Sequence, residues 1–211
     1  MAGYLIELDL REKRSLVVGL GVVGLRKAKG LADAGASVLA VDPDESRVAP
    51  AGVELRAEAY DPDHLDGIHL AFAAASMEVN RRVVADARSR GIWVNAASEP
   101  GSGDFLVPAT YRDGPVAVAV STSGASPRLA ATIRDRVAAV IGPEAAGLAA
   151  LLAELRPELM EQIRDPEERR RRLAAAGSPY WLDRFASLGR EAARSELRDW
   201  FGLSPRADKP R

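Results

Sequence analysis

The stretch that decides the fold is residues 15–42, SLVVGLGVVGLRKAKGLADAGASVLAVD. Two short apolar runs rich in β-branched residues, at 16–18 and 37–41, enclose a segment with apolar residues at helical spacing. A GxGxxG pattern lies where the first run passes into that segment. A strand, a glycine turn, a helix and a second strand together predict one unit of a parallel sheet covered by helices.

Each glycine of the turn has its own physical use. Gly19 permits the tight turn, Gly21 lets backbone N–H groups approach a pyrophosphate, and Gly24 lets the helix pack close to the strand. The start of the helix, at Val22 and Val23, offers the partial positive charge that phosphates favour. Alone the pattern is weak, but its position between a strand and a helix predicts dinucleotide binding.

An acid at the end of the second strand bears on the choice of cofactor. Asp42, followed by Pro43, stands where a carboxylate accepts hydrogen bonds from the adenosine ribose and repels a 2′-phosphate. The turn and the acid therefore predict NAD rather than NADP. The alternative interpretation is a glycine turn next to an unrelated acid.

The first hundred residues continue the alternation of strand and helix. Further strands are expected at 52–58, 68–76 and 92–98, with the last one starting as buried Ile92-Trp93-Val94. The segment 77–91 predicts a helix with Val79, Val83, Val84 and Ala87 facing inward. The fold class expected is α/β, with a Rossmann-type parallel sheet.

Composition excludes several classes of function. The formal net charge of −1 gives no electrostatic basis for non-specific nucleic-acid binding. The chain has no cysteine, and of its two histidines we expect His64 in a surface loop and His69 at the solvent end of a strand, so no metal site is predicted. No apolar run reaches the roughly 18 residues of a membrane helix, and the first residues lack a signal-peptide pattern. We expect a cytoplasmic protein with no membrane partner.

A second signature follows at 114–142. It begins with a strand at Val116–Val120, continues through the loop STSGAS, and enters a helix at Ser126-Pro127 as N-cap and first helical residue. One interpretation is a capped turn and a core helix with a stripe formed by Leu129, Ile133, Val137 and Val140. The other is a site for substrate carboxylates at a hydroxyl-rich helix entry, made by Ser121, Thr122, Ser123, Gly124 and Ser126.

Four stretches of the chain carry a resemblance to a known family. They are 4–41, NRRVVADARSRGIWVN at 80–95, DFLVPA at 104–109, and VAVSTSGASPRLAATIRDRV at 118–137, the last being the most specific. In this order they resemble the precorrin-2 dehydrogenase family, which includes the amino-terminal half of siroheme synthase. The resemblance implies NAD-dependent oxidation of the tetrapyrrole precorrin-2 to sirohydrochlorin, with iron insertion in some members. It also implies a homodimer built largely from the segment after the Rossmann domain.

The resemblance also points to the loop after the fifth strand. In the family, that strand is followed by an aspartate tied to catalysis and chelation, and Ser98 stands at the matching position here. Asp104 matches a second family acid and is retained. We take Ser98 and Asp104 as the candidate catalytic residues and expect dehydrogenation with poor iron insertion, because serine cannot accept a proton as a carboxylate does. Two other interpretations are a non-catalytic NAD-binding regulatory module and a Rossmann subunit that gates a transporter.

The last third of the chain reads as helical. Breaks are expected at Pro166 and at 177–179, and a single last helix is expected to bury a stripe of apolar residues, namely Trp181, Phe185, Leu188, Ala192, Leu197, Trp200 and Phe201. The run Arg169–Arg172 predicts a solvated face, with substrate carboxylates as the alternative partners. The predicted division is a Rossmann domain at 1–113, a small α+β dimerisation segment at 114–150 and a helical C-terminal domain at 151–211.

Overall fold

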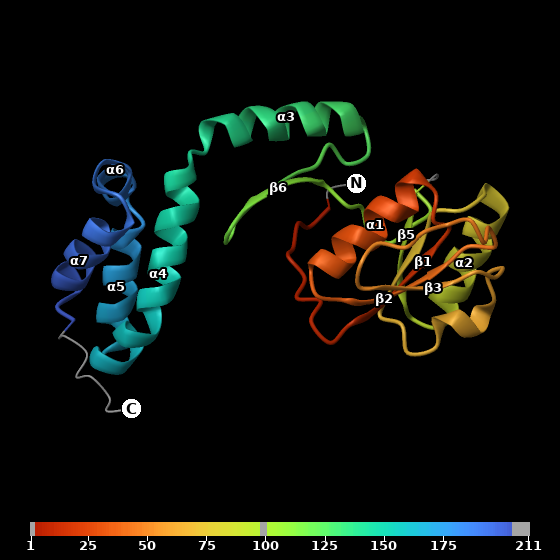
Figure 1. The fold of residues 1–211 in the computed structure, drawn as a ribbon, viewed down its shortest axis with the longest axis horizontal. Helices are drawn as coiled ribbons and strands as arrows, with labels where there is room; N and C mark the ends of the chain where they lie inside the picture. Colours follow the sequence, from red (N-terminus) through yellow and green to blue (C-terminus); the bar gives the residue numbers. More distant parts are fainter. Residues whose placement is uncertain (1–2, 98–100, 204–211) are drawn as a thin grey trace. The chain divides into compact units, whose positions relative to one another are not determined.

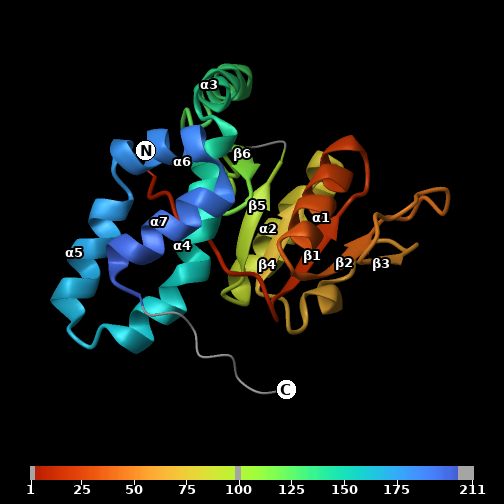
Figure 2. The same cartoon turned by 60° about the vertical axis from the view of Figure 1, so that its left-hand side comes forward.

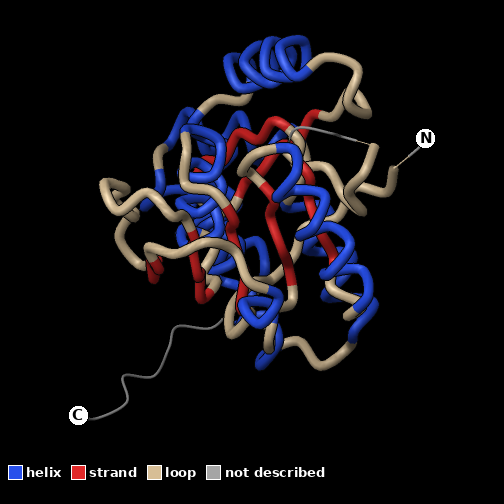
Figure 3. Tube along the Cα trace, turned by 90° about the vertical axis from the view of Figure 1, so that its right-hand side faces the viewer, coloured by secondary structure: helices blue, strands red, loops and turns tan. Residues whose placement is uncertain are grey.

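The computed structural model describes residues 3–97 and 101–203 (Figure 1). The chain divides into two compact units. The first contains Met1–Val107 with Ser123–Ala125, and the second contains Pro108–Thr122 with Ser126–Arg211. Strands alternate with helices through most of the first unit, whereas helices follow one another in the later part of the second (Figure 3).

The first unit is built on a parallel sheet in the order β3-β2-β1-β4-β5 (Figure 2). The strands are β1 (Arg14–Val18), β2 (Ser37–Val41), β3 (Val53–Arg56), β4 (Leu70–Ala73) and β5 (Trp93–Ala96). Every neighbouring pair is parallel. The α/β fold class with a Rossmann-type sheet is confirmed.

Two helices cover opposite faces of this sheet. Helix α1 (Val22–Asp33) and helix α2 (Met77–Ser89) each follow a strand, as the sequence predicted. Along β1, Val17 belongs to the core that includes Ala28 and Leu31 of α1, whereas its neighbour Leu16 belongs to the core that includes Val83 of α2. Successive strand residues point to opposite faces, so one short apolar strand supplies both cores.

Trp93 departs from the buried strand expected at 92–94. Val94 is fully buried, but Trp93 is 53% exposed. Trp93 pairs with Leu70 in register and so faces the same side of the sheet as α1. It lies on the edge strand β5, beyond the strands that α1 packs against, and a side chain at that edge remains in contact with solvent.

The strand order reverses between β1 and β4. The chain leaves β1 toward α1 and leaves β4 toward α2, which cover opposite faces. Loops that diverge in this way open a crevice at the carboxyl ends of the strands, and ligands of open α/β sheets bind there. The glycine turn and the end of β2 both lie at this edge.

The two histidines lie in different surroundings, one buried and one exposed. His64 was expected in a surface loop, but it is buried in the 3₁₀ turn Pro62–Leu65. Its Nδ1 accepts the N–H of Asp61 at 3.0 Å, and its Nε2 lies 2.9 Å from a carboxylate oxygen of Glu58. These bonds hold the ring of His64 within the turn. His69 is exposed at the head of β4, as expected, and within the described ranges no group of His, Cys, Asp and Glu is placed to hold a metal ion.

The second unit begins with an antiparallel hairpin. Strand β6 (Ala109–Asp113) pairs with β7 (Val116–Val120), and helix α3 (Pro127–Val140) packs against both strands. The sequence predicted β7 and α3 but not β6. The division of the chain therefore falls after Val107 instead of between 113 and 114, because β6 exchanges its hydrogen bonds with β7.

Up to residue 203, where the described part of the chain ends, the unit continues with α4 (Pro143–Gln162), α5 (Pro166–Ala176), α6 (Pro179–Leu188) and α7 (Arg190–Phe201). The predicted boundary after residue 150 falls inside α4. The single last helix expected is two helices, because Gly189 adopts φ +74°, a left-handed conformation that ends α6. This break shifts the helical register, so Ala193 rather than Ala192 enters the core, and Trp200 remains 43% exposed.

Charged side chains of the helical region pair with one another. Arg170 is exposed and pairs with Glu167, in agreement with a solvated face. Arg169 and Arg172 are half-buried instead, because they bond to the backbone carbonyls of Ile163 and Phe201. A buried pair joins Glu158 of α4 to Arg198 of α7.

Among the described residues, no single helix is long and apolar enough to cross a membrane, and only the bent pair of α3 and α4 passes that test when counted together.

Candidate functional site

Two glycines of the turn are required by packing. Gly19 has φ +89°, and a Cβ there would lie 2.7 Å from the backbone of Ala74, which follows β4. A Cβ on Gly24 would lie 1.8 Å from the carbonyl oxygen of Gly19. The turn, the start of α1 and the exit of β4 therefore approach one another as closely as backbone allows.

Gly21 is different, because no protein atom lies within 4 Å of the Cβ it lacks. It is the N-cap residue of α1, no side chain caps the helix there, and the side chain of Val22 is exposed. The first N–H groups of a helix have no partner within the helix and attract anions. The open space at Gly21 leaves room for a pyrophosphate, and cofactor binding by Gly19, Gly21, Val22, Val23 and Gly24 remains a prediction.

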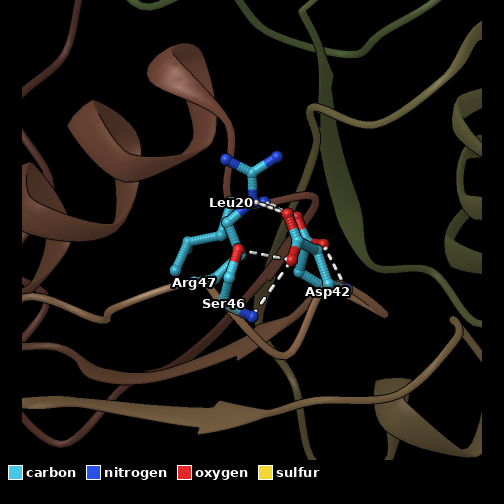
Figure 4. A network of polar contacts seen from close by, with 5 residues as sticks. Leu20, Asp42, Ser46 and Arg47 are labelled. Carbon is cyan, nitrogen blue, oxygen red and sulfur yellow. Dashed lines mark hydrogen bonds and ion pairs between the residues drawn. The ribbon is translucent and has the colours of Figure 1, made fainter.

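Asp42 lies beside the turn and is held by backbone N–H groups (Figure 4). Leu20 donates to its Oδ2 at 2.6 Å, and Asp44 donates to its Oδ1 at 3.0 Å. The residue is 8% exposed, whereas the next residue, Pro43, is exposed. An ionised carboxylate has about four acceptor positions, so these two bonds leave capacity for the two hydroxyls of a ribose.

Arg47 was not singled out from the sequence. It follows the motif Asp42-Pro-Asp-Glu-Ser, whose Asp and Ser residues are typical of turns in which side chains bond to nearby backbone. Its Nε lies 3.2 Å from Asp44 Oδ2 and 3.7 Å from Asp42 Oδ2. The nucleotide-binding edge therefore carries one cation beside its acids.

The segment after β5 runs back along that strand. Asp104 donates its backbone N–H to the carbonyl of Val94 at 2.7 Å, and Asn95 donates its side-chain amide to the carbonyl of Phe105 at 2.8 Å. Gly103 lies so close that a Cβ would come within 2.8 Å of the backbone nitrogen of Ala96. The loop therefore returns toward the amino end of β5.

The carboxylate of Asp104 helps to hold this segment against β5. It accepts the N–H of Val94 at 3.0 Å and a bond from Nε of Arg88, on α2, at 2.9 Å. The sequence offered no signal for Arg88 as its partner. Ser98, the other candidate catalytic residue, lies outside the described residues. Catalytic roles for Ser98 and Asp104 remain predictions.

The hydroxyl-rich loop before α3 bonds largely to itself. Ser126 caps α3 by accepting the N–H of Leu129 at 3.1 Å, as predicted. Thr122 accepts the N–H of Ser126 at 3.1 Å and donates to its carbonyl at 3.0 Å. Ser123 and Gly124 both have positive φ, at 51° and 84°. Substrate binding by Ser121, Thr122, Ser123, Gly124 and Ser126 remains a prediction.

The sequence matches two protein-family models and several siroheme synthases. A family model described as "Putative NAD(P)-binding" matches residues 6–109, and one described as "Sirohaem biosynthesis protein central" matches residues 113–139. The siroheme synthase of Chromobacterium violaceum is 36% identical over 206 residues, which cover 93% of this chain and 43% of that protein. The siroheme synthase of Methylococcus capsulatus is 39% identical over 171 residues, which cover 78% of this chain and 36% of that protein.

The chain belongs to the siroheme synthase amino-terminal domain family. It spans less than half the length of these siroheme synthases. A solved structure described as "SirC, precorrin-2 dehydrogenase" has the same fold, with a TM-score of 0.73, 21% identity, and coverage of 96% of this chain and 100% of that one. The glycine turn and Asp42 both lie within residues 6–109, the region that matches the NAD(P)-binding family model. This match confirms a nicotinamide-dinucleotide cofactor.

Proposed function

We propose that this protein oxidises precorrin-2 to sirohydrochlorin with NAD as hydride acceptor, in siroheme biosynthesis. The observation that carries the proposal is the similarity to siroheme synthases along 93% of the chain, with an intact glycine turn and Asp42 at the cofactor edge. We also propose that it acts in the cytoplasm, as expected from the sequence.

The residues present fit the cofactor, and the first turn of α1 with Gly21 would hold its pyrophosphate. Asp42 would receive the adenosine ribose hydroxyls and disfavour a 2′-phosphate. Asn80 positions the opposite wall, since its side chain bonds to both the N–H and the carbonyl of Ala75, at 2.9 and 3.1 Å. A bound nicotinamide supplies the hydride acceptor, while these groups bind and orient it.

The substrate is a tetrapyrrole with several carboxylates. We propose that the loop containing Ser121, Thr122, Ser123, Gly124 and Ser126 receives carboxylates, because the start of α3 carries partial positive charge and the loop is rich in hydroxyl groups. Ser98 takes the position of the family acid. Since serine neither accepts a proton nor binds ferrous iron as a carboxylate does, we propose that iron insertion is poor or absent.

We also propose a homodimer formed through α3. Three large apolar side chains of this helix are exposed in the single chain: Leu129 at 51%, Ile133 at 37% and Val140 at 84%. Ile133 and Val140 border a surface hollow of about 470 Å³, whose lining also includes Arg136, Val137 and Ile141. A contiguous apolar face of this kind marks an association surface, and the resemblance to relatives that pair through this segment favours a second copy as its occupant.

One anaerobic assay tests the proposed activity. The protein is mixed with precorrin-2 and NAD, ferrous iron is added afterwards, and the absorbance of sirohydrochlorin and then of siroheme is followed. We expect sirohydrochlorin to form and iron insertion to be slow, with Ser98→Asp raising the rate of the second step. NAD binding without any turnover would support the rival function, a non-catalytic regulatory module, for which the serine at 98 is the specific argument.

A further inference from the structure

The loop between β2 and β3 places a cation beside the acid that faces the ribose. Arg47 Nε lies 3.7 Å from Asp42 Oδ2, and the Arg47 side chain is 41% exposed (Figure 4). The same oxygen of Asp42 accepts the N–H of Leu20, in the glycine turn, at 2.6 Å. A group bound at the 2′ position of the adenosine ribose would therefore meet both a carboxylate and a guanidinium.

The position of Arg47 does not depend on Asp42 alone. Its backbone N–H bonds to the carbonyl of Asp44 at 3.1 Å, and its Nε lies 3.2 Å from the carboxylate of the same residue. Asp44 is fixed in turn by Ser46, whose N–H and hydroxyl both bond to Oδ1. These bonds from Ser46 hold the pKa of Asp44 below its ordinary value, so the partner of Arg47 stays ionised. If the charge of Asp42 were removed, Arg47 would retain its anchor.

The balance of charge at this edge decides which nucleotide fits. Asp42 and Asp44 are negative and Arg47 is positive, so a dianionic 2′-phosphate meets a net negative surface, whereas the neutral hydroxyl of NAD does not. The guanidinium fork matches phosphate geometry and binds it more strongly than neutral donors do. Without the charge of Asp42, the same three positions would become neutral overall and would contain a phosphate-binding group.

We propose that Arg47 is a second determinant of cofactor specificity, which opposes Asp42: it is the group that would bind a 2′-phosphate, and Asp42 prevents this. This inference rests on the nucleotide-binding part of the proposed function and names a residue that this function did not require. It needs no assumption about the tetrapyrrole.

The test measures binding of NAD and NADP by calorimetry to the full chain and to three variants. The unmodified protein should favour NAD. Arg47→Ala alone should change both affinities little, because Asp42 still prevents a 2′-phosphate from binding. The loss of NADP affinity by about tenfold, the effect of one charge-assisted hydrogen bond, should appear when Asp42 is already replaced. Asp42→Asn should weaken NAD and strengthen NADP, and adding Arg47→Ala to it should remove the gain in NADP affinity.

Arg11→Ala is the matched control. Arg11 is an exposed arginine that pairs with Asp9 and contacts Gly35, before β2, so its loss removes the same charge from the other end of that strand. It should leave both affinities unchanged. Equal effects on NAD and NADP when Arg47→Ala is added to Asp42→Asn, or no binding of either nucleotide by the unmodified protein, would overturn the inference. Absence of precorrin-2 turnover with nucleotide binding intact would overturn only the proposed enzyme activity.

Discussion

The carboxylate of Asp104 accepts a hydrogen bond from the backbone N–H of Val94 at 3.0 Å, while the backbone N–H of Asp104 bonds back to the carbonyl of Val94 at 2.7 Å. This reciprocal pair joins the loop after β5 to the strand that precedes it. Arg88 of α2 completes the arrangement with an ion pair to the same carboxylate at 2.9 Å. The acid retained from the family pattern therefore holds its own segment against β5 and α2.

If Asp104 only positions the loop, Asp104→Asn should lower the free energy of unfolding by about 1 kcal/mol and leave turnover nearly intact. The asparagine oxygen can still accept the N–H of Val94, and what is lost is a charge-assisted bond to a partly exposed arginine. Urea unfolding and steady-state rates measure the two effects.

Arg88→Ala is the control for that prediction. It should cost a similar amount of stability, and the double variant should cost less than the sum, because both changes remove one interaction. Turnover abolished by Asp104→Asn but retained by Arg88→Ala, with NAD still bound, would instead make Asp104 a catalytic residue.

Two glycines of the turn should respond in opposite ways to alanine. Gly21→Ala adds a methyl group to open space at φ −68°, so the melting temperature should change little while NAD affinity falls by tenfold or more. Gly24→Ala forces a Cβ against the Gly19 carbonyl and should cost about 1–3 kcal/mol, the usual effect of overpacking. Thermal unfolding and calorimetric titration with NAD distinguish the two. A large loss of stability in Gly21→Ala would mean that packing, and not a ligand, requires the glycine.

The apolar face of α3 gives a prediction about assembly. Val140→Asp should convert a dimer into a monomer in light scattering at micromolar concentration, because an aspartate at this 84% exposed position would be buried unpaired in the interface. Ala139→Asp, at an exposed neighbour that does not line the hollow, should leave the dimer intact. A monomeric unmodified protein would contradict the proposed interface.

Two glutamates of α4 allow a matched comparison of stability. Glu158 is 3% exposed and pairs with Arg198, so Glu158→Gln, which removes the negative charge from an ion pair with a buried carboxylate, should cost about 3–5 kcal/mol. Glu154 pairs with Arg190 and Arg194 at the surface, so Glu154→Gln should cost less than about 1 kcal/mol. Urea unfolding of both variants measures the difference, and equal costs would show that solvent screens the inner pair as well.

Much of the nucleotide-binding half could be predicted from local pattern. The alternation of short apolar runs with helical spacing identified the five strands and two helices of the first unit, because buried parallel strands and the helices that cover them must each be apolar in their own period. The positions of the glycine turn and Asp42 could be predicted because both lie within one β-α-β unit, at a spacing that the sequence shows directly. The cap at Ser126 was predictable for the same reason, since its bond spans three residues.

What depended on distant pairing could not be predicted. Strand β6 has little apolar signal and exists because it shares hydrogen bonds with β7. Trp93 is exposed because β5 is the edge of the sheet, and His64 is buried within a 3₁₀ turn, where its ring bonds to Asp61 and Glu58. The same holds for the partners of Asp104 and Arg47.

The sequence by itself determined the kind of fold, the cofactor edge and the family. Periodicity and turn chemistry are properties of neighbouring residues, and a family resemblance depends on the order of residues along the chain. Only the tertiary structure decided which backbone groups and cations each carboxylate meets. Asp42 and Asp104 look alike as letters, yet Asp42 lies at the carboxyl end of β2 and Asp104 returns to the amino half of β5. The physical reason is that a side chain's function depends on what surrounds it, and those neighbours are brought together only by folding.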